Sequence, residues 1–229
     1  MGNYKYGMIL LESSLETLPP NIARTKKAIV LSKRYGIPPE FLLLDVSQFH
    51  DEMKRFGISV RRGRPDIVHQ FLLASQYSPL NITGKLKVYV HTWKGDIIDV
   101  ASEARIPKNY FQFVGLIQSL HLNGSVPPGD RPLLKLIRGV SLKKFLEEIG
   151  AKRLILMHEK GRKATGEELK EFIYPPYIFG IGGFPHGDFS EQIFSLSTDR
   201  ISFLQGLQLD AWVAADRLLC LLEHSELLR

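Results

Sequence analysis

Runs of apolar residues alternate with amphipathic stretches along the whole chain, and the segments between them are short. This alternation is typical of an α/β protein. In the first half of the chain the pattern predicts, in order, a strand at 6–11, a basic helix over 21–35, a strand at 41–46, two strands within 85–100 and a helix over 109–122. The turn dipeptide Lys94-Gly95 separates the two strands within 85–100, so we expect these strands to form a hairpin.

The same alternation resumes after the loop 123–131. Ser141 is a good N-cap for the helix SLKKFLEEIG, and Gly150 stands where the last turn favours a left-handed residue. The remaining predicted elements are a strand at 152–157, a short helix opened by the capping box Thr165 and Glu168, a strand at 177–180 and a long helix over 209–228. Apolar residues cover more than one stripe of the long helix, which indicates burial against its own domain and a second subunit, or a central position in a monomer.

Composition narrows the class of protein. The 229 residues are 44% hydrophobic and 24% charged, which excludes intrinsic disorder. The single cysteine, Cys220, excludes a disulfide scaffold and indicates a reducing compartment. No apolar run has the length of a membrane span, and the N-terminus lacks a signal-peptide layout. We therefore expect a soluble cytoplasmic protein, whose net charge of +6 is a weak bias toward polyanions.

A dense basic cluster follows the first predicted helices. Five cations and no acid lie within eleven residues: Lys54, Arg55, Arg61, Arg62 and Arg64. Arginine suits phosphate recognition, so the cluster is a candidate RNA track, although a solvated surface loop explains it as well. Pro65 and Asp66 are suited to the first turn of a helix, where the Asp66 carboxylate would hold Arg64 in one rotamer.

A second basic element, Arg105-Ile106-Pro107-Lys108-Asn109-Tyr110, precedes the helix over 109–122. Its mixture of cations, an amide and an aromatic ring is typical of surfaces that bind single-stranded RNA. An ordinary helix entry, with Tyr110 and Phe113 in the core, is an equally good interpretation.

A glycine-rich segment lies between Gly180 and Asp188 and contains four glycines, which would let its backbone approach a ligand closely. The segment matches neither a dinucleotide fingerprint nor a P-loop, and a plain β-turn is the alternative. Scattered histidines indicate no metal site. Cys220 falls on the apolar side of the last predicted helix, where we expect an inert thiol.

Three motifs in this order suggest a family: RRGRPDIVHQFLL, then KLKVYVHT with EARIPKNYFQFVGL, then FGIGGFPHGDF. Together they resemble the pseudouridine-N1-specific methyltransferases of small-subunit ribosomal RNA, a branch of the SPOUT class that assists ribosome biogenesis. The resemblance extends from MILLESSLETLP to LDAWVAADRLL, so it covers nearly the whole chain. It implies one domain over 1–229, an α/β fold with a mostly parallel sheet, helices on both faces and a C-terminal trefoil knot. It also implies a homodimer, S-adenosylmethionine as cofactor and small-subunit ribosomal RNA as partner.

The resemblance also assigns residues. An RNA-binding extension falls around 50–112 and the cofactor-binding knot around 152–229. Cofactor-binding positions of the family match Gly182, Gly187, His158 and a loop aligned as Leu204, Gln205, Gly206, Leu207, Gln208 and Leu209. The stretch 198–208 is longer than the short loop of the family and lacks its proline, so the alignment of the loop uses its C-terminal side. RNA-contact positions match Arg64, Asp66, Arg105, Lys108 and Gln112, of which Gln112 replaces a family arginine.

The chemistry implied by this resemblance agrees with what the sequence lacks. Methyl transfer from a sulfonium to a ring nitrogen is a direct displacement, which needs alignment and loss of one proton but no metal and no covalent enzyme nucleophile. Asp66 is a tentative base, and it is better suited to orient Arg64. The leading hypothesis is an S-adenosylmethionine-dependent methyltransferase that acts on N1 of a pseudouridine. The alternative is a non-catalytic RNA-binding factor of ribosome assembly.

Overall fold

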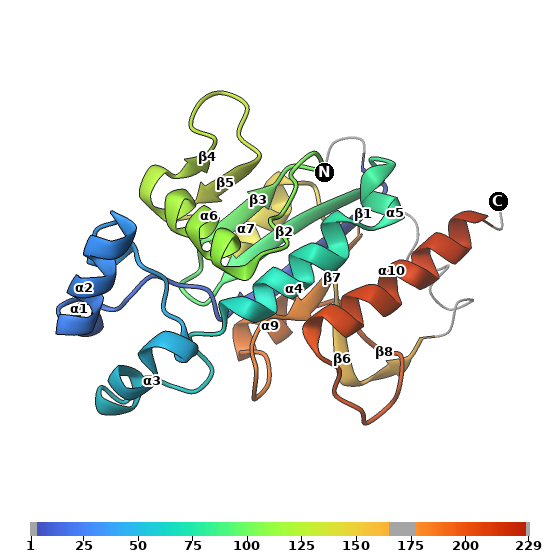
Figure 1. Cartoon of the computed structure of the whole chain (residues 1–229). Coiled ribbons are helices and arrows are strands. Elements are labelled where there is room, and N and C mark those ends of the chain that lie inside the picture. The colour runs from blue at the N-terminus through green and yellow to red at the C-terminus, as the bar shows by residue number, and fades with distance from the viewer. Residues whose placement is uncertain (1–3, 165–176, 228–229) are drawn as a thin grey trace.

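The strand β1 (Tyr6–Ser13) occupies the centre of one mixed sheet, and its side chains are buried on both faces. The structure is a computed structural model that describes residues 4–164 and 177–227. Within these residues the sheet has eight strands in the order β4-β5-β3-β2-β1-β7-β6-β8 (Figure 1). The other strands are β2 (Leu86–Thr92), β3 (Ile97–Val100), β4 (Ser125–Val126), β5 (Leu134–Ile137), β6 (Arg153–Lys163), β7 (Tyr177–Gly182) and β8 (Asp199–Ser202).

Five neighbouring strands, from β2 through β1, β7 and β6 to β8, run parallel. The three strands at the other edge, β3, β5 and β4, pair antiparallel. The expected mostly parallel sheet is therefore confirmed. Since parallel strands end at one edge, the segments that follow β1, β7 and β8 meet there.

Helices cover both faces of the sheet, as the sequence predicted. One face packs on α4 (Pro65–Gln76), α6 (Tyr110–Asn123) and α10 (Ala211–Leu227) around a large core. The opposite face packs on α7 (Leu142–Glu148) and α9 (Glu191–Leu196). In Figure 1, α4 and α10 lie side by side in front of β1 and β7. The short helix α5 (Pro79–Ile82) follows α4 and also contacts α10.

A small lobe of helices stands apart from the sheet, at the left of Figure 1. It consists of α1 (Pro20–Ala23), α2 (Lys26–Tyr35), the 3-10 turn η1 (Pro39–Phe41) and α3 (Val46–Arg55). These elements bury their own apolar cluster, which includes Ile22, Leu44 and Phe49. The region 50–112, predicted as an RNA-binding extension, begins in this lobe and continues through α4 into β2 and β3 of the sheet.

Two predicted elements differ from the structure. The segment 41–46 is not a strand: residues 42–45 form a buried connection between η1 and α3. Leu42 and Leu44 fill the core of the small lobe, while Leu43 packs in the large core and forms only an isolated bridge, with Thr17. The basic helix over 21–35 is divided into α1 and α2, since the Thr25 side chain accepts a hydrogen bond from the Ala28 amide and starts a new helix.

Other local predictions are confirmed. β2 and β3 form the expected hairpin across Lys94-Gly95, and Ser141 caps α7. The sequence pattern missed the short strands β4 and β5, which flank a loop, and also α3, α9 and β8. β8 lies at 199–202, so the stretch 198–208 that was expected to be a loop begins with a strand. The capping box at Thr165 and Glu168 lies outside the described residues.

Gly161 lies where β6 and β8 approach most closely. A Cβ atom there would stand 2.6 Å from the backbone N and C atoms of Ile201, which no side-chain rotation relieves. We expect Gly161→Ala to lower the free energy of unfolding by about 2 kcal/mol, the usual scale of overpacking. Denaturant unfolding measures this change.

Gly115 in α6 provides the matched control, because a Cβ there meets no atom within 4 Å. Gly115→Ala should keep or slightly raise stability. Equal unfolding midpoints for Gly161→Ala and the parent chain would refute the close approach of β6 and β8.

Candidate functional site

A cavity of about 390 Å³ opens beside the carboxyl ends of β7 and β8. Four segments line it: Met157–Glu159 of β6, residues 181–182 and 184–189 at and after β7, Ile201–Phe203 at the end of β8, and residues 207–212 with Ala214 at the start of α10. Arg64 and Ile67, at the start of α4, complete the wall. The cavity therefore joins the glycine-rich segment to the basic cluster, although the two are far apart in sequence.

Glycine lets the segment after β7 cross the end of β1 at very short range. A Cβ on Gly183 would lie 2.7 Å from Ser13 Oγ and 2.8 Å from Ser13 Cα. Backbone hydrogen bonds hold this crossing, from Gly183 N to Leu11 O at 2.8 Å and from Ser14 N to Gly183 O at 2.9 Å. A side chain at position 183 would force this segment away from β1. The close crossing therefore requires glycine at this position, which a plain β-turn would not.

A buried histidine fastens the same segment to β6. Lys160 N donates to His158 Nδ1 at 3.1 Å, so Nε2 carries the proton and donates to Asp188 Oδ1 at 2.9 Å. Phe189 N also donates to Asp188 Oδ1, at 2.8 Å. Burial acts to raise the pKa of Asp188, but the hydrogen bonds from His158 and Phe189 outweigh it and lower that pKa. The pair thus presents an ionised carboxylate at one end of the cavity.

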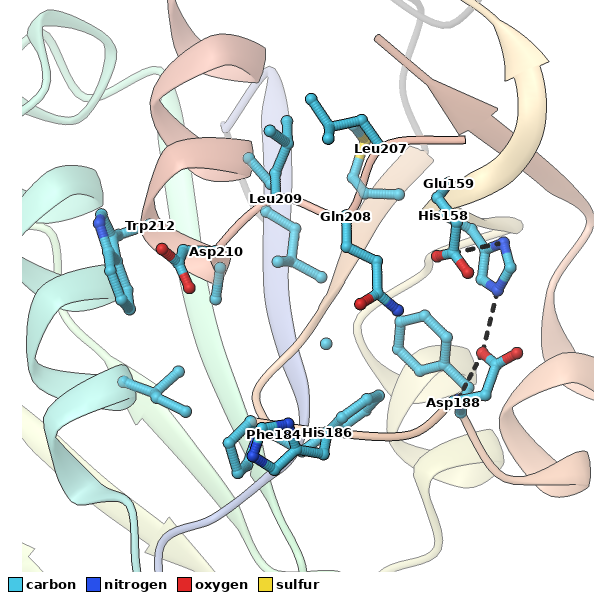
Figure 2. A pocket seen from close by; sticks show the side chains of 18 of the residues that line it. His158, Glu159, Phe184, His186, Asp188, Leu207, Gln208, Leu209, Asp210 and Trp212 are labelled. Atoms are coloured by element: carbon cyan, nitrogen blue, oxygen red, sulfur yellow. Dashed lines mark hydrogen bonds and ion pairs between the residues drawn. The ribbon is translucent and has the colours of Figure 1, made fainter. Parts of the chain in front are cut away.

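The loop before α10 supplies the opposite wall. The side chains of Gln208 and Leu209 extend into the space between Trp212 and the His158–Asp188 pair (Figure 2). Gly206 N donates to Glu159 O at 3.0 Å, which ties this loop to β6. The wall combines an amide, apolar side chains and an aromatic ring.

The structure brings most of the predicted cofactor residues together. Gly182, Gly187, His158, Leu207, Gln208 and Leu209 all line the cavity. Leu204, Gln205 and Gly206 do not line it, and Leu204 is exposed. The lining residues that sequence reasoning missed include Glu159, Asp210 and Trp212. The motif LDAW at the entry to the last helix was the signal for Asp210 and Trp212.

Arg64 stands at the rim of the cavity in a fixed orientation. Its Nε and Nη2 atoms donate to the two carboxylate oxygens of Asp66, both at 2.8 Å. These hydrogen bonds raise the pKa of Arg64 above its ordinary value. Asp66 lies in the first turn of α4, as predicted, and both of its oxygens are engaged by Arg64. The pair agrees with a positioning role for Asp66 and leaves it poorly suited to take a proton.

The basic cluster is not a continuous track of free cations. Arg62 turns inward and donates to both oxygens of the buried Glu16, at 2.6 and 2.5 Å. Arg61 lies over the Phe184 ring, 4.2 Å from its centroid, and 3.8 Å from the Glu12 carboxylate. Arg61 and Arg62 are therefore held by carboxylates and an aromatic ring of the fold. Two of the five expected cations thus support the structure near the cavity instead of forming part of an RNA track.

The second basic element runs along α4. His69 Nε2 lies 2.7 Å from Pro107 O, and the Tyr77 hydroxyl donates to Ile106 O at 2.9 Å. The three predicted contact residues of this element, Arg105, Lys108 and Gln112, are exposed. Phe113 is fully buried, so the element serves as a helix entry and also presents exposed polar side chains.

The last helix corrects one expectation about chemistry. Cys220 is exposed on α10 and is not a core residue.

None of the helices in the described residues is long and apolar enough to cross a membrane. Across residues 4–164 and 177–227, no group of three His, Cys, Asp or Glu side chains is arranged to hold a metal ion.

A second cavity, of about 190 Å³, lies near the ends of β1 and β2. His121, at the end of α6, lines it and is 7% exposed. Arg138 Nη2 donates to the His121 carbonyl at 2.8 Å, while the His121 Nε2 atom has no hydrogen-bond partner among the described residues. Burial, with smaller contributions from Arg138 and Lys94, lowers the pKa of His121 to about 4.

This lowered pKa predicts acid sensitivity. Below pH 6.5 the unfolded chain binds a proton at His121 that the folded chain excludes until the pH approaches 4, so stability falls as the pH falls. The expected loss between pH 7 and pH 5 is about 2 kcal/mol for this one group. His121→Gln should remove it, as measured by urea unfolding at both pH values. The same loss in variant and parent chain would show that His121 titrates normally.

Comparison with known proteins decides the family. The model of the EMG1/NEP1 methyltransferase family matches residues 8–223 of the chain. The chain belongs to the EMG1/NEP1 methyltransferase family. It is 41% identical to the ribosomal RNA small subunit methyltransferase Nep1 of Staphylothermus marinus over 219 residues, which are 95% of this chain and 94% of that protein. Identity to Nep1 of Thermococcus sibiricus is 38%, over 95% of this chain and 97% of the relative.

A solved Nep1 structure shares the fold. The crystal structure of Archaeoglobus fulgidus Nep1 bound to S-adenosylhomocysteine superposes with a TM-score of 0.84 at 34% identity, covering 97% of this chain and 99% of that one. The sequence resemblance to ribosomal RNA methyltransferases is therefore confirmed at the level of the EMG1/NEP1 family and its α/β fold.

Proposed function

We propose that this protein is an S-adenosylmethionine-dependent methyltransferase that acts on ring nitrogen N1 of a pseudouridine in small-subunit ribosomal RNA and assists biogenesis of that subunit. One observation carries the proposal: the glycine-rich segment, the loop before α10 and the paired Arg64 enclose a single cavity. The names of the Nep1 relatives and the S-adenosylhomocysteine in one relative support the substrate class and the cofactor.

The residues present fit such a cofactor. The cavity of about 390 Å³ lies within the range of small-molecule sites, roughly 300 to 1,000 Å³. Leu209 and Trp212 supply apolar walls, while the carboxylates of Glu159, Asp188 and Asp210 suit a ligand with a positive sulfonium, an amino group and hydroxyls. Gly182, Gly187, His158 and Leu207–Leu209 would hold it. When bound, S-adenosylmethionine would supply the methyl group: the bond between sulfur and the methyl carbon breaks, which leaves S-adenosylhomocysteine, as the ring nitrogen bonds to that carbon and releases its proton to solvent.

The protein's own contribution is orientation. Arg64 presents a guanidinium on the rim of the cavity, and the two hydrogen bonds that it donates to Asp66 keep it in one rotamer before RNA arrives. Preorganised charge of this kind lowers the cost of placing the target ring beside the methyl donor. Pseudouridine fits the proposal because its N1 carries a proton, whereas the corresponding nitrogen of uridine bears the sugar.

Exposed side chains beyond the rim extend the RNA surface. We assign Arg105, Lys108 and Gln112, on the segment between β3 and the first turn of α6, to contacts with RNA outside the target nucleotide. Gln112 is uncharged. Its amide donates a hydrogen bond to RNA, but it does not attract phosphate as the arginine of the family would. The RNA-binding extension around 50–112 and the cofactor-binding part around 152–229 then face each other at Arg64.

We also propose the trefoil knot and the homodimer that the family resemblance implies. Placement of β7 between β1 and β6, with three C-terminal segments around one cavity, supports the knot. On α10 the side chains of Trp212, Val213 and Leu221 stay half-exposed after the helix has packed on α4, which supports a second subunit. The mass in solution, from light scattering, tests the dimer; a monomeric mass at micromolar concentration contradicts it.

Two measurements test the function. Isothermal titration with S-adenosylmethionine should show binding to the folded protein. Methylation of a pseudouridine-containing stem-loop should then proceed, while the same stem-loop with uridine stays unmodified. RNA binding without cofactor binding would instead identify a non-catalytic assembly factor.

A further inference from the structure

The smaller cavity lies on the same edge of the sheet as the candidate cofactor site. Segments directly after β1 and β2 line it, together with side chains from three other elements; the lining residues are Leu15, Glu16, Thr17, Phe41, Thr92, Lys94, Asp96, His121 and Arg138. The backbone bond from Ser14 N to Gly183 O, at 2.9 Å, joins the walls of the two cavities. Arg61 turns toward the cofactor side and Arg62 toward Glu16, so the basic segment lies between the cavities.

Several polar groups at this cavity have unused hydrogen-bonding capacity. In the described part of the chain, the Asp96 carboxylate accepts no hydrogen bond, although its backbone N donates to Thr92 Oγ1. Lys94 Nζ stands 3.9 Å from Glu16 Oε2, beyond hydrogen-bond distance. Arg138 uses only Nη2, toward the His121 carbonyl. An acceptor and two donors therefore face one small space.

The available Asp96 carboxylate favours a ligand that can donate a hydrogen bond. Glu16 is already neutralised by its two hydrogen bonds with Arg62, so the lining charges that remain are the Asp96 carboxylate and the cations Lys94 and Arg138. Burial raises the pKa of Asp96, because the ionised carboxylate has lost part of its hydration. An ionised phosphate has no proton to donate and would lie beside this carboxylate, whereas a neutral heterocycle with an amino group donates to Asp96 and also accepts from Lys94 or Arg138.

The size and the ring on the wall point to a flat heterocycle. At about 190 Å³ the cavity is below the range of roughly 300 to 1,000 Å³ that holds whole drug-sized ligands. Phe41 lines one side, and bases of single-stranded RNA stack on such rings.

We propose that this cavity holds one nucleobase of the RNA substrate, close to the target nucleotide, and that it prefers a base with an exocyclic amino group. Asp96 accepts from the amino group of cytosine, adenine or guanine, while Lys94 or Arg138 donates to a neighbouring ring nitrogen or carbonyl. Uracil would place the O4 carbonyl against the carboxylate. The inference rests on the proposed function, because it requires RNA across the Arg61–Arg64 segment.

The test uses the full chain and a series of pseudouridine-containing stem-loops, in each of which one loop nucleotide is replaced by uridine. Fluorescence anisotropy at one fixed salt concentration measures affinity. For the parent protein, replacement at one position should weaken binding roughly tenfold, the usual scale for one base contact. Asp96→Ala should abolish that difference and bind the uridine RNA as the parent does.

Controls separate this contact from general electrostatics and from misfolding. Asp130→Ala removes the same charge at an exposed residue away from the cavity and should keep the discrimination. Unchanged S-adenosylmethionine affinity reports that Asp96→Ala is folded. If it does not fold, Asp96→Asn keeps the shape and should still reduce the preference.

Three results would overturn the proposal. Discrimination that persists in Asp96→Ala rules out the base contact. Equal weakening for every RNA indicates a backbone contact instead, and free cytidine monophosphate bound as tightly as RNA indicates a site for a free nucleotide. A parent protein that neither binds nor methylates RNA would overturn the proposed function itself, whereas normal methylation without Asp96-dependent preference would overturn only this inference.

Discussion

Gly187→Val should weaken S-adenosylmethionine binding roughly 10- to 100-fold, because two penalties combine at this position. Gly187 has φ +88°, a conformation that a β-branched residue adopts only with strain. Its Cβ would also stand 3.3 Å from Nη1 of Arg61, which is held against the Phe184 ring and has little freedom to move away. The segment that lines the cavity would have to shift. Isothermal titration measures the change in affinity.

The matched control for this prediction is Gly84→Val. Gly84 has a similar φ of +71°, but a Cβ there meets nothing within 4 Å, and the residue lies between α5 and β2, outside the cavity lining. This variant should lose some stability and keep its cofactor affinity. If both variants bind S-adenosylmethionine like the parent chain, the glycine-rich segment is not part of the cofactor site.

Arg64→Ala should reduce kcat/KM for methylation of the stem-loop roughly 10- to 100-fold, since a hydrogen bond to a charged group is worth about 1.5 to 3 kcal/mol. The guanidinium lines the cavity and is held by both oxygens of Asp66, so its removal takes away a preorganised contact at the reacting end. Arg64→Lys should recover little, because a lysine cannot make the paired hydrogen bonds with Asp66. Steady-state kinetics at fixed salt concentration gives the ratio.

An exposed arginine of the small lobe controls for charge. Arg34→Ala, in the last turn of α2, removes the same charge away from the cavity and should change kcat/KM by less than about twofold. Cofactor affinity of Arg64→Ala should stay within about threefold of the parent value. Equal losses of kcat/KM in the two variants would show that Arg64 acts only through its charge and makes no specific contact with RNA.

The local signals that proved correct were those with a short-range cause. Ser141 caps its helix because its side chain accepts a backbone amide three residues along, and Lys94-Gly95 turns the hairpin for a similarly local reason. The segment 41–46 misled the pattern, because Leu42 and Leu44 are buried in the small helical lobe, while Leu43 packs in the large core without its backbone joining the sheet. Apolar periodicity reports burial, and it does not say which neighbour provides it.

The sequence by itself determined the fold class, the family and most of the cavity glycines, because those follow from periodicity and from motifs that lie within single segments. Only the tertiary structure decided which cations are free. Arg61 and Arg62 look like Arg64 in sequence, yet Phe184, Glu12 and Glu16, from strands and loops far along the chain, draw the first two inward. Cys220 became exposed for the same reason, since the packing of α10 on α4 settles which side of the helix faces outward. Charge and apolarity are properties of a residue, but partnership and exposure are properties of the neighbours that folding provides.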